Sequence, residues 1–273
     1  MMEGFFRIGA MAEIVLSLGA INTPKVLMQS GIGNQTDLQR LGIPVVQHLP
    51  GVGENFQDHP LILGCVWEHQ ESKAVTQEEQ AVIFWKSSPS LDTPDMSCHI
   101  GEGLYLSPET LKFNPPVNSW TMAPAIFRPK SRGRIRLTGP DPLDPIELTT
   151  NHLEDGNDVK ALVRCVEFCR DIASSAALRP FTKREVIPGG IKGKSLEDFI
   201  RDSVVTYWHQ TCTAKMGTDS MSVVDSQLKV YGIENLRIAD GSIMPRITTG
   251  NTMAPCVIIG ERAGEMLKTA HGI

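Results

Sequence analysis

His209 and Asn251 have side chains that can act on a small molecule. His209 lies in the segment WHQTCTAKMG, residues 208–217. Because a neutral imidazole has a pKa near neutral pH, it can accept the proton of a hydroxyl group. The amide of Asn251 can hydrogen-bond a substrate oxygen, and it also suits the cap of a following helix. Taken alone, a histidine more often has a structural role, so the surrounding pattern has to decide.

Other reactive side chains give weaker indications. Asp58 and His59 are adjacent in the loop LPGVGENFQDHP and look like a catalytic pair, but we expect a structural role for both. Cys165 and Cys169 lie four residues apart on a predicted helix. We expect them to be small buried thiols rather than a redox pair. The sequence contains no Cys-x-x-Cys pair and no zinc-type spacing, so we expect no metal site.

The composition is that of an ordinary globular protein and disfavours several classes of partner. Of 273 residues, 41% are hydrophobic and 21% are charged, and the net charge is −5. There is no basic tract of the kind that binds nucleic acid. No stretch reaches the ~20 apolar residues of a membrane span. Glu13 interrupts the apolar start of the chain, so a secretory signal is not favoured. We therefore expect a cytoplasmic protein with no nucleic-acid partner and no membrane span.

The elements that must position these residues are short strands and amphipathic helices. Residues 12–18 predict a strand. Between residues 61 and 148, short apolar runs alternate with proline-rich connections, which predicts an antiparallel sheet that includes the run GRIRLTG. Apolar periodicity and capping signals predict helices in the following places: within 19–33, with Thr23 as cap and Pro24 in the first turn; 36–41; 157–178; from a cap at Ser195 toward Tyr207; and from about Thr252 to Lys268.

Three segments of the chain resemble the glucose–methanol–choline (GMC) oxidoreductase family. Residues 19–33, GAINTPKVLMQSGIG, match every specified position of the family's second signature. A chance match of this kind is expected in about one chain in a million. Residues 208–217 resemble the family's active-site histidine segment, and residues 224–263 resemble its closing flavin-contact segment. The resemblance covers residues 12–270.

One part of the family pattern is not found. Family members begin with a strand, a G-x-G-x-x-G turn and a helix, which bind the ADP part of FAD. Three candidate turns fail at the third glycine, where they have Thr36, Phe56 and Leu106. We therefore expect the N-terminal dinucleotide-binding segment to be missing from this chain, and we count a separate N-terminal FAD-binding chain among the candidate partners.

The resemblance implies an α+β fold with three parts. Residues 65–205 would form a substrate-side domain, an antiparallel sheet backed by helices. Residues 1–64, with the GMC signature, and residues 206–273, with the catalytic residues, would lie on the flavin side. Together they would form parts of an FAD-binding Rossmann-like domain without its N-terminal segment.

The resemblance also implies a function. It implies an FAD-dependent enzyme that oxidises a small-molecule alcohol to a carbonyl, with hydride transfer to flavin N5 and electrons passed to oxygen or another acceptor. His209 would be the base that takes the hydroxyl proton, and Asn251 would be its partner. The implied cofactor contacts are Trp208, Thr252 and Met253 along the flavin ring, and Asp240 and Gly241 near the ribityl and pyrophosphate region.

Two alternatives stay open. The chain can be a truncated, non-catalytic fragment of this family that cannot hold FAD alone and leaves apolar sheet edges uncovered. Less favoured is an activity like that of the hydroxynitrile lyases, which share the GMC scaffold.

Overall fold

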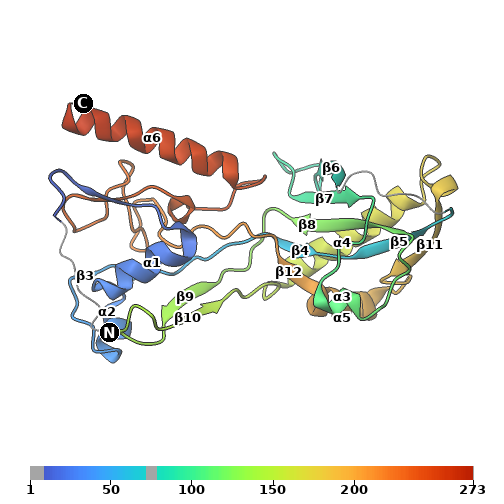
Figure 1. Ribbon diagram of the computed structural model, residues 1–273, viewed down its shortest axis with the longest axis horizontal. Helices are drawn as coiled ribbons and strands as arrows, with labels where there is room; N and C mark the ends of the chain where they lie inside the picture. Colours follow the sequence, from blue (N-terminus) through green and yellow to red (C-terminus); the bar gives the residue numbers. More distant parts are fainter. Residues whose placement is uncertain (1–8, 72–78, 273) are drawn as a thin grey trace, which may run out of the picture.

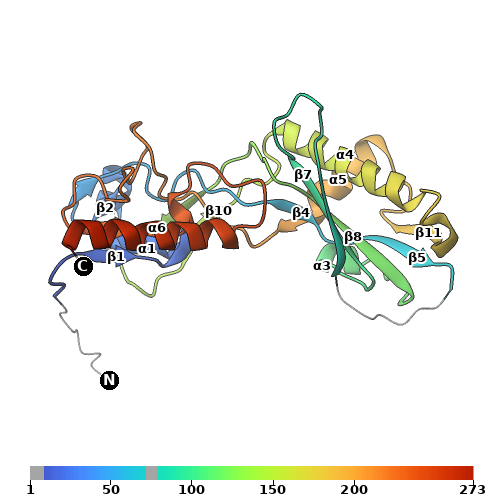
Figure 2. The same cartoon turned by 90° about the horizontal axis from the view of Figure 1, so that it is seen from above.

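The chain folds into two lobes that follow each other along the long axis of the molecule (Figures 1 and 2). The computed structural model describes residues 9–71 and 79–272. The outer ends of the predicted parts, residues 1–8 and 273, and the stretch 72–78 lie outside the described residues. We call the part that contains the C-terminal helix the mixed lobe, and the part that contains the large sheet the sheet lobe.

The sheet lobe is built on a seven-stranded antiparallel sheet. The short apolar runs of residues 61–148 predict such a sheet, but two of its strands, residues 182–187 and 204–206, lie outside that range and were not predicted. β8 (Ser119–Ile126) lies at its centre, between β7 (Met96–Gly101) on one side and β5 (Cys65–His69) and β4 (Pro60–Ile62) on the other. The outer strands are β6 (Glu79–Trp85) beside β7, β11 (Thr182–Ile187) beside β5, and β12 (Val204–Thr206) beside β4.

Helices cover one face of this sheet, because side chains alternate between the two faces of a strand. Met122 of β8 packs into the main core with helix α4 (Gly156–Ala173), whereas Ala123 belongs to a separate small cluster on the other face. Helix α5 (Gly193–Ser203) packs against α4. The lobe's other helical elements are α3 (Pro108–Leu111) and the 3-10 turn η1 (Arg179–Phe181).

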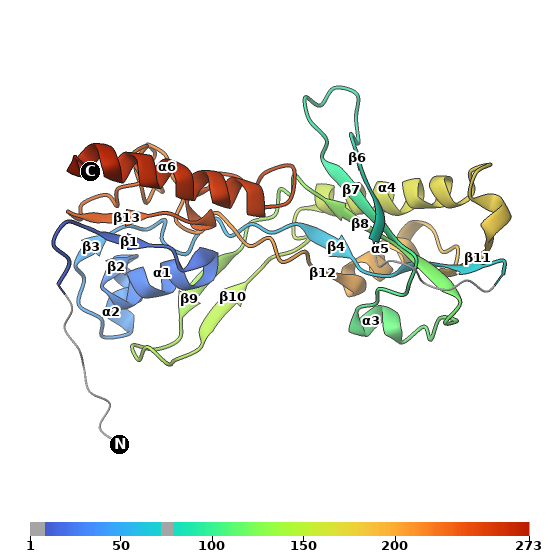
Figure 3. The same ribbon diagram turned by 45° about the horizontal axis from the view of Figure 1, so that its top comes forward.

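The mixed lobe combines helices with short strand pairs. α1 (Gly19–Gln29) and α2 (Gln35–Arg40) share one core, and the long helix α6 (Met253–His271) lies along the outer side of the lobe (Figures 1 and 3). The remaining elements are the parallel pairs β1 (Ile14–Leu16) with β13 (Leu236–Ile238) and β2 (Ile32–Gly33) with β3 (Gln47–His48), the antiparallel pair β9 (Arg134–Leu137) with β10 (Ile146–Thr149), and the turn η2 (Gly241–Ile243). Among the described helices, none is long and apolar enough to cross a membrane.

The run GRIRLTG forms a strand, but that strand does not join the large sheet as predicted. β9 and β10 lie beside α1 (Figure 3), and Ile135 and Leu137 belong to the core of the mixed lobe. The N–H of Ile135 donates to the carbonyl of Gly53 at 2.7 Å. Gly53 has φ +80, and a β-carbon there would lie 2.5 Å from the carbonyl oxygen of Ile135. The close approach therefore requires glycine. Residues 134–149 thus lie in the mixed lobe and not with the rest of the predicted domain 65–205.

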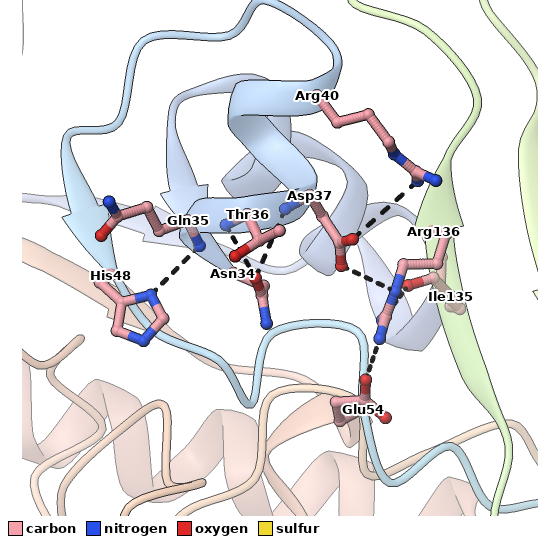
Figure 4. A network of polar contacts seen from close by, with 9 residues as sticks. All are labelled: Asn34, Gln35, Thr36, Asp37, Arg40, His48, Glu54, Ile135 and Arg136. Atoms are coloured by element: carbon pink, nitrogen blue, oxygen red, sulfur yellow. Dashed lines mark hydrogen bonds and ion pairs between the residues drawn. The ribbon is translucent and has the colours of Figure 1, made fainter.

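A polar network holds this hairpin against α2 (Figure 4). The Nε of Arg136 lies 3.0 Å from the carboxylate of Asp37, and its terminal nitrogen pairs with Glu54. Asn34 caps α2 by accepting the N–H of Thr36 at 2.9 Å. Because the Arg136 side chain is only 17% exposed, solvent screens these pairs less than it screens surface pairs. The network therefore helps to fix β9 relative to α2.

α1 begins earlier than its capping pattern predicts. The helix starts at Gly19, so Thr23 and Pro24 lie inside it. Because proline has no N–H, the carbonyl of Ala20 loses its helical partner. The fully buried hydroxyl of Thr213 replaces that partner and donates to Ala20 at 2.6 Å. A residue far along the chain thus allows the helix to extend past the predicted cap.

The other predicted helices differ from the structure only near their ends. α2, α4 and α6 each begin within a few residues of the predicted position. α5 begins at Gly193 and ends at Ser203, so Ser195 lies inside the helix and is not its cap.

Candidate active site

Two chain segments that run side by side between the lobes carry the candidate site. β4 and β12 form one antiparallel pair, and beyond it the N–H of Tyr207 donates to the carbonyl of His59 at 3.1 Å. Gln57 and Thr211 continue the ladder through reciprocal backbone bonds of 2.9 and 3.2 Å. This pairing places His59 beside His209, which lies 150 positions later in the sequence.

Asp58 joins the two segments through its side chain and is only 3% exposed. Its Oδ1 accepts the N–H of His59 at 2.8 Å and the N–H of His209 at 3.0 Å. Its Oδ2 accepts the hydroxyl of Thr206 and, at 3.4 Å, the amide of Gln210. A buried carboxylate with four donors is well satisfied. Asp58 therefore fixes the backbone that carries both histidines.

The rings of His59 and His209 are in direct contact. Their Nδ1 atoms are 2.9 Å apart, and Nε2 of His59 lies 3.0 Å from the carbonyl oxygen of Thr248. The fully buried ring of His59 stacks on Phe127 with a centroid distance of 4.2 Å. On its other side, the ring of His209 meets Tyr207 at 4.4 Å. His59 thus bridges His209 and the segment that leads into α6.

Burial keeps both imidazoles neutral. Burial and, to a lesser extent, the neighbouring His209 lower the pKa of His59 to about 3. Hydrogen bonds to the backbone carbonyls of Thr248 and Phe127 act in the opposite direction. Burial also lowers the pKa of half-buried His209, where Asp58 raises it and His99 lowers it further. Both rings are therefore uncharged at neutral pH, and an uncharged imidazole is the form that accepts a proton.

A cavity of about 360 Å³ lies on the face of the large sheet that the helices leave uncovered. Strand residues such as Leu61 and Ala123 line it, together with Tyr105 and Tyr207. The hydroxyl of Tyr207 is hydrogen-bonded to Nε2 of His99, which also lines the cavity. A volume of this size and a mainly apolar and aromatic lining are typical of sites for small molecules.

Two of the predicted site residues line this cavity, and a third lies next to it. Trp208 and Asn251 line it, and His209 follows Trp208 directly and packs on Tyr207, which is another lining residue. Trp208 has φ +60 and is 66% exposed. A left-handed conformation is strained for a large side chain and is often found at functional sites. The backbone here turns so that Trp208 is exposed while its neighbours Tyr207 and His209 are half-buried.

Thr252 and Met253 lie next to the cavity, at the start of α6. Thr252 is the N-cap of this helix, but its side chain makes no capping bond. Met253, Val257 and Ile258 are large apolar residues that are 73%, 55% and 61% exposed. A helix N-terminus favours negative charge, and exposed apolar side chains indicate a binding surface. The start of α6, at Thr252 and Met253, therefore fits a flat ring that carries partial negative charge, as the flavin of FAD does.

Asp240 and Gly241 do not line the cavity. The carboxylate of Asp240 accepts the hydroxyl of Thr23 at 2.6 Å and backbone N–H groups of Gly19 and Ser242 at 3.0 and 2.7 Å. A β-carbon on Gly241 would lie 3.2 Å from a sulfur atom of α6. Within the described chain, these residues fasten α1 and α6 to the turn η2.

Sequence reasoning missed the place of Asp58 and His59 in the site. Both do hold structure, but they do so in direct contact with His209. The available signal was the adjacent pair of polar residues at the end of a glycine-rich loop. Within residues 9–71 and 79–272, no group of three or more His, Cys, Asp or Glu residues is arranged to hold a metal ion.

Comparison with known proteins places this chain in a family. Two family models, both described as GMC oxidoreductase, match residues 3–61 and 129–260. The mitochondrial choline dehydrogenase of Homo sapiens is 35% identical over 291 residues, which cover 96% of this chain and 48% of that protein. The choline oxidase of Arthrobacter globiformis is 36% identical over 276 residues, which cover 97% of this chain and 50% of that protein.

A solved structure shows the same arrangement of elements. The crystal structure of pyridoxine 4-oxidase from Mesorbium loti aligns with a TM-score of 0.87 and 29% identity, over 95% of this chain and 52% of that one. The chain spans about half the length of the curated relatives that it matches. On the two family models and these alignments, the chain belongs to the GMC oxidoreductase family.

Proposed function

We propose that this chain provides the substrate cavity and the catalytic base of an FAD-dependent oxidoreductase that oxidises a CH–OH group to a carbonyl. The observation that carries the proposal is the neutral imidazole of His209 beside a small, largely apolar cavity, with His59 behind it. Oxidation of an alcohol requires a base for the hydroxyl proton. Homologues in this family are FAD-dependent and act on alcohols.

In this proposal His209 and Asn251 have separate tasks. His209 takes the hydroxyl proton of the alcohol. Asn251, at the rim of the cavity, donates an amide hydrogen bond to the substrate oxygen and stabilises the negative charge that develops there. FAD, when bound, supplies the acceptor for the hydride. The apolar lining keeps water away from the carbinol carbon and suits a small alcohol with an apolar or aromatic body.

Five residues would hold the cofactor. Trp208, Thr252 and Met253 would contact the flavin ring, and the N-terminus of α6 would favour its anionic reduced form. Asp240 and Gly241 would lie near the ribityl and pyrophosphate region. Because the carboxylate of Asp240 already has three donors, it would act by holding the backbone of Gly241 and Ser242 in place.

The mixed lobe also offers a surface for further polypeptide. β1 and β13 form a parallel pair of only two strands, and Ile14 and Val15 are 52% and 37% exposed. Parallel strands are normally covered on both faces, and α6 exposes Val257 and Ile258 as well. A segment with the dinucleotide-binding strands and glycine turn would cover these residues, either as a separate chain or within a longer one.

Reconstitution tests the proposal. The purified chain is mixed with FAD, alone and together with the N-terminal half of a GMC relative, and flavin absorbance is followed without oxygen. We expect flavin to be retained only with the added half and to be bleached by an alcohol. The H209A variant should retain flavin but not be bleached.

The same experiment distinguishes the alternatives. Flavin that is bound but not bleached by aliphatic, aryl or choline-type alcohols would support a non-catalytic fragment. Cleavage of a cyanohydrin without bleaching would support a lyase. The cytoplasmic location stays a prediction, since the human relative is named as mitochondrial.

A further inference from the structure

The carbonyl of Thr248 determines which nitrogen of His59 carries a hydrogen. A carbonyl oxygen can only accept a hydrogen bond, and it lies 3.0 Å from Nε2 of His59. If Nε2 were unprotonated, two lone pairs would face each other inside a fully buried site. Nε2 of His59 must therefore donate to Thr248.

The hydrogen between the two rings follows from the neutrality of His59. Burial keeps the pKa of His59 near 3, so the ring carries a single hydrogen, which sits on Nε2. Its Nδ1 is then an acceptor. Nδ1 of His209, only 2.9 Å away, must be the donor. In neutral His209 this leaves the lone pair on Nε2.

We propose that His59 is a positioning residue that holds His209 in the tautomer protonated on Nδ1, so that Nε2 of His209 is the basic atom. The use of that atom as a base rests on the proposed function, but the tautomer does not. The arrangement resembles the use of a carboxylate behind a catalytic histidine, which fixes the tautomer and orientation of the ring. Here the orienting group is a second, uncharged imidazole.

The surroundings of His59 preserve this arrangement when His209 gains a proton. The Nδ1–H of protonated His209 keeps its acceptor on His59, while the stack on Phe127 holds the plane of the His59 ring. Of the charged and titratable groups that face His209, Asp58 favours the protonated form and His99 opposes it, and Tyr207 packs on its ring. His59 adds a neutral acceptor, which favours the protonated form without adding charge.

Nitrogen NMR of the chain labelled with 15N-histidine tests the proposal without flavin or substrate. Long-range proton–nitrogen correlations distinguish a protonated ring nitrogen from an unprotonated one. The seven histidines are assigned by single substitutions. We expect His209 at neutral pH to be protonated on Nδ1 and His59 on Nε2. A His209 that carries its proton on Nε2 in the wild-type chain would overturn the proposal.

Two substitutions of His59 sharpen the test. H59F keeps a flat ring for the stack on Phe127 but removes both nitrogens. It should abolish the preference of His209 for the Nδ1–H form and lower the pKa of His209 by roughly one unit, through loss of one hydrogen bond to the protonated form. H59N retains an oxygen that can accept from His209 and should restore both. An H59F chain whose His209 keeps its wild-type tautomer and pKa would contradict the proposal.

The control is H48F, which removes an exposed imidazole from the strand β3. It should leave the tautomer and pKa of His209 unchanged. If H59F does not fold, as judged by circular dichroism, the wild-type spectrum and H59N still decide. Correct tautomers in a reconstituted complex that never oxidises an alcohol would defeat the proposed function alone.

Discussion

Replacing Asp58 with alanine removes the acceptor that four donors share in a site that is 3% exposed. The hydroxyl of Thr206 and the amide of Gln210 can turn toward other partners. The backbone N–H groups of His59 and His209 cannot. An unsatisfied buried donor costs about 1–3 kcal/mol. Because the N–H of His59 is buried and that of His209 is partly buried, the free energy of unfolding should fall by about 3 kcal/mol.

D58N divides this effect into its parts. The amide keeps one oxygen for the two backbone N–H groups, so we expect it to lose about half as much stability as D58A. Asp58 is the charge that raises the pKa of His209. Its neutralisation should therefore lower the pKa of His209 further, which is measured by NMR titration.

Urea unfolding followed by tryptophan fluorescence measures the stability of both variants. The matched control is D92A, which removes a carboxylate whose side chain is 77% exposed and which pairs with Arg128 at the surface. That change should alter the unfolding midpoint little. If D58A unfolds within about 1 kcal/mol of the wild-type chain, Asp58 does not hold the two histidine segments together.

Three further predictions follow from buried groups. T213V should lower the free energy of unfolding by about 1–2 kcal/mol, measured with urea, and the loss should shrink when P24A restores an N–H for the Ala20 carbonyl. Because the pKa of His59 is about 3 in the folded chain and 6.5 in the reference state, the unfolded chain binds this proton first as pH falls. The free energy of unfolding should therefore fall by about 2 kcal/mol between pH 7 and 5. In urea titrations at both pH values, the H59F variant should not show this loss. In a thiol-reagent assay of the native chain, half-buried Cys256 should react first, since the other five cysteines are fully buried; equal rates for all six would refute this.

Local patterns predicted the elements whose causes are local. The apolar periodicity of α4 and the alternating runs of the large sheet each depend on neighbours within one element. The predicted start of α1 at a Thr23 cap was wrong, because the hydroxyl of Thr213 that satisfies the Ala20 carbonyl lies almost 200 positions away. β9 was placed in the wrong sheet for a similar reason, since its partners Gly53 and Asp37 belong to distant segments.

In the candidate site, too, features with local determinants could be predicted and features that depend on distant residues could not. His209 and Asn251 could be selected from the sequence because their segments resemble a family pattern. In the structure Asn251 lines the cavity, and His209 packs on Tyr207, another lining residue. The contact between His59 and His209 could not be selected, since it depends on a ladder that pairs residues 57–62 with residues 204–211. The role of His59 is a property of the fold and of the Thr248 carbonyl, and neither follows from residue types alone.

The most direct test of the central claim is the pH dependence of the single-turnover rate of flavin bleaching by an alcohol in the reconstituted complex. The rate should rise with pH through one ionisation, whose pKa is below 6.5 and equals the value that NMR gives for His209, because burial lowers that pKa. H209A should lose this ionisation and at least about 100-fold in rate. An H209A complex that keeps the wild-type rate and pH profile would contradict the account.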